Sequence, residues 1–265
     1  MASAVLYPED AFRGPQPRPT PVVVPVHGSI GSSSAGAISA VLGVTTLIGW
    51  IFDIPLLKTV LPGLVNMKAN TAICFVLLGV ALVLPRATAA LVAICVGAFA
   101  LLTLAEYLGL KVGIDELFFR DADPLSVNAP GRSSATSTAA LLLIAAALLL
   151  ARYSGRWALV AQASALAAAT LAWLAILGYT SGVKDLYGLP GLTPIALHAA
   201  VGFLVVSLGV LALRPEVGVV RLLLAKTAGG LLLRRLTPVV ILGPTLLSWG
   251  CHVGAQSHLY DRNVG

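Results

Sequence analysis

The sequence predicts an all-α fold, a polytopic integral membrane bundle of about seven transmembrane helices built from repeated helical hairpins. The first observation is composition: 58% of the 265 residues are hydrophobic, only 11% are charged, and the mean hydropathy is +0.93. Soluble domains carry about 25% charged residues. The second is that the apolar blocks approach the roughly 20 residues that cross a bilayer as helix, without the alternation of a membrane barrel.

The third observation is an internal repeat. Three apolar runs follow a Pro-Gly turn, at residues 62–63, 130–131 and 190–191. An alignment that brings these turns together to within one residue superimposes Thr71, Thr138 and Ala199. The position before them then holds a polar residue in each copy: Asn70, Ser137 and His198.

A second motif lies near the ends of other apolar runs. It reads TLIGW (46–50), TLAEY (103–107), TLAWL (170–174) and TLLSW (245–249). Self-similarity at a long period is typical of an internally repeated architecture, so we expect each unit to pair one run of each kind.

Taken in order, residues 1–33 form a proline-rich tail, which we expect to be flexible and cytoplasmic, and residues 34–265 form the transmembrane domain. Spans are predicted at residues 35–52, 69–84, 88–109, 134–151, 157–180, 194–213 and 236–253. Pro55 and Pro85 follow the first two spans because proline does not continue a helix. Residues 110–133 form a polar loop, and the basic, apolar residues 214–235 predict an interfacial helix.

The distribution of Lys and Arg predicts the orientation. With the N-terminus inside, ten of these residues lie on the inner side and seven on the outer side, and an excess of Lys and Arg marks the cytoplasmic side. All Pro-Gly turns then lie on the outer face. Seven spans also place the C-terminus outside. The last span resembles the first half of a fourth unit, which leaves open a truncation before an eighth span.

Polar residues beside membrane spans are candidates for function. Those at the predicted outer level form our candidate ligand-binding set: Asp53, Asn70, Glu106, Ser137, His198, Ser248 and His252. The alternative is that these residues cap helices or lie in water at span ends. His198 and His252 also leave haem as a remote cofactor. We expect no other cofactor, no metal and no catalytic residue, since no P-loop, HExxH or nucleophile motif occurs.

Several segments together resemble the membrane-embedded sensory region at the N-terminus of many bacterial sensor histidine kinases and diguanylate cyclases. The segments that carry this resemblance are 49–82, GIDELFF (113–119), 129–143, 193–215, 229–250 and HLYD (258–261). The resemblance implies a multi-pass protein of the bacterial inner membrane. It also implies a cytoplasmic kinase or cyclase output, which is absent from the residues up to Gly265.

The leading hypothesis is therefore a non-enzymatic sensory or anchoring domain that passes an extracytoplasmic or membrane cue to a cytoplasmic output. Its expected partners are the lipid bilayer and either a second copy or a fused or bound signalling module. The net charge of +6 is assigned to contact with anionic lipid rather than nucleic acid. The alternatives are a non-catalytic subunit of a larger membrane complex and a small transporter or channel.

Overall fold

The computed structural model describes residues 30–61, 63–121, 130–188 and 192–256, and within these ranges every regular element is a helix. The predicted tail, residues 1–33, lies outside the described residues except for its last four, which belong to the first helix. The helices are α1 (Ile30–Ile51), α2 (Pro55–Thr59), α3 (Ala69–Ala81), α4 (Arg86–Tyr107), α5 (Ala135–Leu150), α6 (Arg156–Ser181), a 3-10 turn η2 (Lys184–Leu186), α7 (Leu197–Ala212), α8 (Gly218–Leu224) and α9 (Ala228–Gln256).

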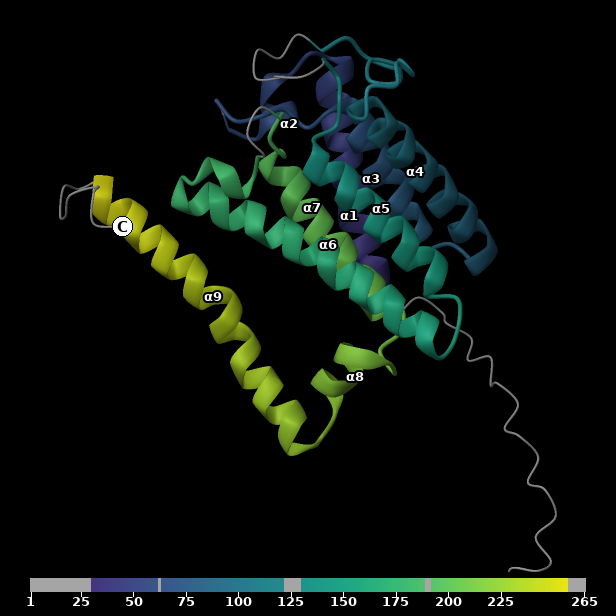
Figure 1. Cartoon of the computed structure of the whole chain (residues 1–265), viewed down its shortest axis with the longest axis vertical. Coiled ribbons are helices and arrows are strands. Elements are labelled where there is room, and N and C mark those ends of the chain that lie inside the picture. Colours follow the sequence, from purple (N-terminus) through teal and green to yellow (C-terminus); the bar gives the residue numbers. More distant parts are fainter. Residues whose placement is uncertain (1–29, 62, 122–129, 189–191, 257–265) are drawn as a thin grey trace, which may run out of the picture.

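The core of the bundle is a triangle of three short helices, α3, α5 and α7. Three longer helices pack against neighbouring pairs of them: α4 against α3 and α5, α6 against α5 and α7, and α1 against α7 and α3. Figure 1 shows the bundle from the side. Each long helix and the short helix that follows it along the chain make one unit: α1 with α3, α4 with α5, and α6 with α7. The predicted hairpin repeat is therefore present as three units around a common axis.

Burial separates the two kinds of helix. No described residue of α5 is exposed, whereas α1 and α4 each present many exposed apolar side chains. The Phe75 and Phe203 rings, from α3 and α7, lie 4.7 Å apart at the centre, and both side chains are fully buried. The short helices thus supply most of the core of the bundle, and the long ones supply most of its exposed apolar surface.

In the part of the chain that the structure describes, four helices are long and apolar enough to cross a membrane: α1, α4, α6 and α9. These four carry the four copies of the TL motif. The other three predicted spans are α3, α5 and α7, with 13, 16 and 16 residues. They are shorter than the roughly 20 residues of a full span, so the count of seven is not confirmed.

The three short helices begin in the same way. An extended residue precedes each, with φ and ψ of −68° and 144° at Lys68, −60° and 153° at Ser134, and −68° and 142° at Ala196. The carbonyl of each accepts the first helical N–H bond at 2.9–3.0 Å. These equivalent residues correct the sequence alignment in the second copy by one position: Ser137, rather than Thr138, matches Thr71 and Ala199. The error arose because the second Pro-Gly turn lies two residues closer to its helix than the first.

One hydrogen bond recurs in all three units. An aromatic residue at the end of each long helix donates to the backbone carbonyl just before the extended residue of its short helix. The three bonds are Trp50 Nε1 to Met67 O at 2.9 Å, Tyr107 OH to Ser133 O at 2.9 Å, and Tyr179 OH to Ile195 O at 2.6 Å. We call these three residues the aromatic latches. The third latch, Tyr179, lies five residues beyond the end of TLAWL, so the motif alignment was wrong in that copy.

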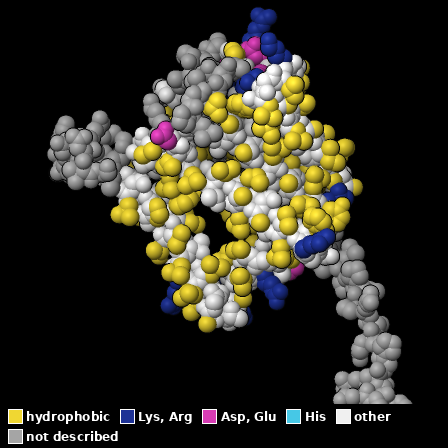
Figure 2. Space-filling view, in the orientation of Figure 1, with side chains coloured by type: hydrophobic (Ala, Val, Ile, Leu, Met, Phe, Trp, Pro, Cys, Tyr) yellow, Lys and Arg dark blue, Asp and Glu magenta, His cyan; other side chains and the backbone are white. Residues whose placement is uncertain are grey.

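The chain leaves the triangle after α7. The interfacial helix predicted over 214–235 is instead the short α8 followed, after a break, by the start of α9. α9 packs against α6 and α8 and runs through Pro238 and Pro244 as one helix. Hydrophobic side chains cover both the flank of the bundle and α9 (Figure 2). Ten large apolar side chains of α9, between Leu231 and Trp249, are exposed.

Glycine permits a close contact between α1 and α3. A Cβ built on Gly79 would lie 2.5 Å from the carbonyl oxygen of Gly36, and one built on Gly43 would lie 2.5 Å from that of Ala72. Such distances leave no room for a methyl group, so these backbones touch directly, as small residues allow in membrane helices.

We therefore expect Gly79→Ala to lower the stability of the bundle by about 1–3 kcal/mol, because α1 and α3 must separate to admit the methyl group. The matched control is Gly243→Ala on α9, where a Cβ would meet nothing within 4 Å. Thermal unfolding of both variants in detergent checks this. Equal midpoints for the two variants would contradict the close contact.

Candidate functional site: a polar recess at the openings of the short helices

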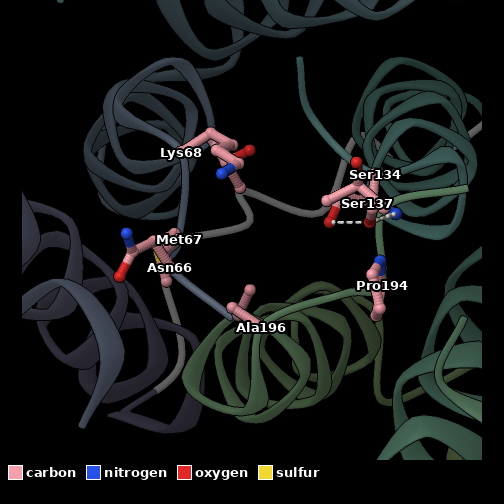
Figure 3. A pocket seen from close by; sticks show the side chains of 10 residues that line it. Asn66, Met67, Lys68, Ser134, Ser137, Pro194 and Ala196 are labelled. Atoms are coloured by element: carbon pink, nitrogen blue, oxygen red, sulfur yellow. Dashed lines mark hydrogen bonds between the residues drawn. The ribbon is translucent and has the colours of Figure 1, made fainter. Parts of the chain in front are cut away.

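The three short helices open onto one polar recess. Each contributes its extended residue and the residue three positions later: Lys68 and Thr71, Ser134 and Ser137, Ala196 and Ala199. Asn66, Met67, Thr193 and Pro194, from the segments leading into α3 and α7, complete the lining. In Figure 3 these side chains surround an opening between the ends of the three helices. The recess therefore lies on the axis of the triangle, and the openings of the three units share one end of the bundle.

The recess suits a small polar group. Its enclosed volume is about 10 Å³, room for roughly one water molecule, and about 220 Å³ when the space open to solvent is included. Hydroxyl groups line it, and the amino-terminal ends of three helices, which carry partial positive charge, surround it. Ser134 Oγ accepts from the Ser137 amide at 3.1 Å and donates to the Ser137 hydroxyl at 2.9 Å, so the α5 contribution is already capped.

The long loop after α4 is fastened next to this recess by two predicted site residues. Glu106 Oε1 accepts from the amides of Gly113 and Ile114 at 2.6 and 3.0 Å. The Asn70 amide donates to the carbonyls of Ile114 and Asp115 at 3.0 and 2.8 Å. Both side chains thus bind loop backbone, and they supply partners to amides and carbonyls that have none within a helix.

A buried ion pair fastens the same loop farther along. Lys68 Nζ lies 2.7 Å from Asp121 Oδ2, and the two side chains are 3% and 1% exposed. Asp121 Oδ2 also accepts from the Gly131 amide at 2.8 Å. The pair joins the residue before α3 to the loop, and the Asp121 carboxylate balances the charge of Lys68, the lysine that lines the recess.

A third fastening surrounds Arg132, just before α5. Its Nε and Nη2 atoms lie 2.8 and 2.7 Å from Asp115 Oδ2, and Nη2 lies 3.8 Å from Glu106 Oε2. The guanidinium also lies over the Tyr107 ring, 5.2 Å from its centroid. Burial raises the pKa of Asp115 to about 6; Arg132 opposes this rise, and the nearby Glu106 adds to it.

The other predicted site residues lie elsewhere. Asp53 is exposed and pairs with Lys58 at 2.5 Å. Ser248 lies on α9, outside the triangle, and the side chain of His252 lies outside the described residues. His198 is buried in α7 with no hydrogen-bond partner for either ring nitrogen. The haem expectation for the two histidines stays untested. Of the predicted site residues whose side chains are described, Ser137 alone lines the recess, while Asn70 and Glu106 bind the neighbouring loop.

Sequence reasoning missed several residues that the structure brings to this end. Among them are Lys68, Ser134 and Thr193 in the recess, and Asp115, Asp121 and Arg132 beside it. The helix-start alignment held a signal for Lys68 and Ser134, because they precede two of the three equivalent openings. Nothing in the local sequence pairs Lys68 with Asp121, which lies 53 positions along the chain.

Comparison of the chain with protein-family models, with curated proteins and with solved structures found no match. Among the described residues, no group of three or more His, Cys, Asp or Glu side chains is arranged to hold a metal ion.

The buried ion pair predicts a large and selective effect of one substitution. Lys68→Met leaves the Asp121 carboxylate buried without its partner, so we expect a loss of about 3–5 kcal/mol. The matched control is Lys58→Met, which removes the ammonium from the pair with the exposed Asp53. That change should cost no more than about 1 kcal/mol. Unfolding in detergent compares the two, and similar losses would show that the Lys68–Asp121 pair carries no special weight.

Proposed function

We propose that this chain is the sensory domain of a bacterial signal-transduction protein, and that the recess is where a small polar cue acts. The observation that carries the proposal is the convergence of three helix openings on one recess. A molecule bound there touches all three short helices at once. Because these helices form the core, binding that favours one packing of the triangle over another would move the long helices as well.

The chemistry at the recess supports sensing over catalysis. Hydroxyls, backbone amides and a charge-paired lysine can bind a ligand, but they supply no activated nucleophile and no free general base. The resemblance of the sequence to sensory regions of histidine kinases and diguanylate cyclases supports the same reading. The output module would be fused to the chain or bound as a separate subunit.

The chemistry beneath the recess gives less support to a transporter. Met67, Phe75 and Phe203 fill the core, and all three are almost fully buried. Polar groups within the triangle are isolated, such as the Ser207 hydroxyl. A subunit of a larger complex stays a second candidate because of the exposed apolar surface of α9. Stoichiometric co-purification of an integral membrane partner from native membranes would favour it.

The proposed topology places the protein in the inner membrane, with the recess and the long loop outside and the turn between α5 and α6 in the cytoplasm. Val112 and Tyr153 are exposed at the two positions. In a chain whose three cysteines are replaced by Ala, Val112→Cys should react with a membrane-impermeant maleimide on intact cells. Tyr153→Cys should react only after permeabilisation. The reverse pattern would invert the topology.

A physiological test follows from the position of Ala199, which is 1% exposed and lines the recess. Deleting the chain from its host should change cyclic di-GMP or response-regulator phosphorylation several-fold, and the wild-type chain should restore the level. Ala199→Val, which narrows the recess, should fail to restore it, while Val201→Ala on the lipid-facing side of α7 should succeed. Thermal unfolding verifies that both variants fold. Identical output with and without the chain would refute the sensory role.

A further inference from the structure

One buried oxygen in the loop fastening has no hydrogen-bond donor. Glu106 Oε2 belongs to a side chain that is 2% exposed, and no described group donates to it. Its nearest cation, Arg132 Nη2, lies 3.8 Å away, beyond hydrogen-bond length. A buried carboxylate oxygen without a hydrogen-bond donor is costly, so this atom marks a position where a further proton donor would be stabilising.

The Asp115 carboxyl lies where it can supply that proton. Its Oδ2 lies 2.7 Å from Arg132 Nη2, and the same nitrogen lies 3.8 Å from Glu106 Oε2, so one guanidinium group holds both carboxylates next to each other. Two carboxylates and one guanidinium carry a net charge of −1 in a partly buried site. One added proton neutralises the cluster and converts one acceptor into the donor that Glu106 Oε2 lacks.

The other groups around the cluster are already engaged. The Tyr107 hydroxyl donates to Ser133 O, and Asn70 donates to loop carbonyls. Lys68 is paired with Asp121, whose backbone amide donates to Glu116 Oε1. None of these neighbours is positioned by a described contact to neutralise the second carboxylate, so the proton must come from solution.

We propose that Glu106, Asp115 and Arg132 form a proton-binding site, and that uptake of one proton fastens the long loop beside the recess. This inference deepens the proposed sensory function by naming acidity on the loop side of the membrane as a cue. It rests on that function only for its physiological meaning, because proton binding by the loop is a property of the isolated protein.

The direction of the effect follows from linkage. In the fastened loop the pKa of Asp115 is raised to about 6, mainly by burial, against 3.8 for the free side chain. We call the loop fastened when Asp115 is held in the cluster with Glu106 and Arg132, and released when Asp115 is in water. Between these two pKa values the fastened state holds a proton that the released state does not. Fastening therefore strengthens as the pH falls through about 6 and weakens as the pH rises through it. Because Asp115 is partly exposed, we expect a several-fold change in the equilibrium.

The test uses the full chain in lipid nanodiscs, with the native cysteines replaced by Ala and a spin label at Val112→Cys. Label mobility should fall between about pH 7.5 and pH 5 as the loop becomes fastened. Difference infrared spectra over the same range should show a protonated carboxyl band. Asp115→Asn keeps the size of the side chain and removes the charge, so both signals should lose their pH dependence and the label should stay immobile.

Two further variants make the outcome decisive. Glu106→Gln also removes one charge and should abolish the carboxyl band, while its side-chain oxygen can still accept from Gly113 and Ile114. Asp53→Asn, at an exposed aspartate outside the cluster, should leave both signals as in the wild type. A wild-type response that is flat, or that persists in Asp115→Asn, would overturn the proton site. Neither result would bear on a different cue at the recess, so the sensory proposal would stand or fall separately.

Discussion

The constraint on which this structure depends is that buried backbone must find hydrogen-bond partners where water is scarce. A short helix that begins inside the bundle exposes the carbonyls of its entry segment. The same solution occurs three times: an aromatic side chain from the preceding long helix donates to the carbonyl just ahead of the helix start. The latches use an indole once and a phenol twice, so the repeat preserves the bond and not the residue. Each latch also fixes the orientation of its short helix relative to its long helix. The recess is the space between the starts of the three short helices.

The middle unit carries an addition that the other two lack. The residue before the latch is Gly49 in the first unit, Glu106 in the second and Gly178 in the third. The two glycines lie against the following chain, with a Cβ on either one falling 2.7 Å from a leucine side chain. In the second unit a carboxylate takes this place and binds the backbone of a longer loop. The residue before the latch thus differs in its contact with the segment that joins the long helix to the short one. Glycine lets that segment pack closely, and Glu106 binds it through a carboxylate.

Much of the architecture could be predicted from the sequence, and the limits have physical causes. Composition and the Pro-Gly repeat predict a helical membrane protein in three units, and the units are present. The starts of the short helices could be predicted to within three residues, because the spans expected from 69, 134 and 194 begin at Ala69, Ala135 and Leu197. Their place at the centre of the bundle could not be predicted, because it depends on contacts between runs that lie far apart in the chain. The register of the second unit failed because its turn is shorter. Of the site, Ser137 was named through an alignment that matched it with Asn70 and His198, whereas its structural equivalents are Thr71 and Ala199. Asn70 and Glu106 were identified as polar residues at the right level, but their partners are loop backbone atoms that leave no sequence signal.

The triangular core has a consequence for how such a protein can grow. Each pair of short helices already has a long helix packed against it, with α1 packed against α7 and α3. A duplicated helix added to the chain finds no vacant place, and α9, which carries the fourth TL motif, packs outside on α6. A further copy of the unit therefore cannot enlarge the triangle. It can only add a peripheral helix, and such a helix can take on a role that the three enclosed units do not share.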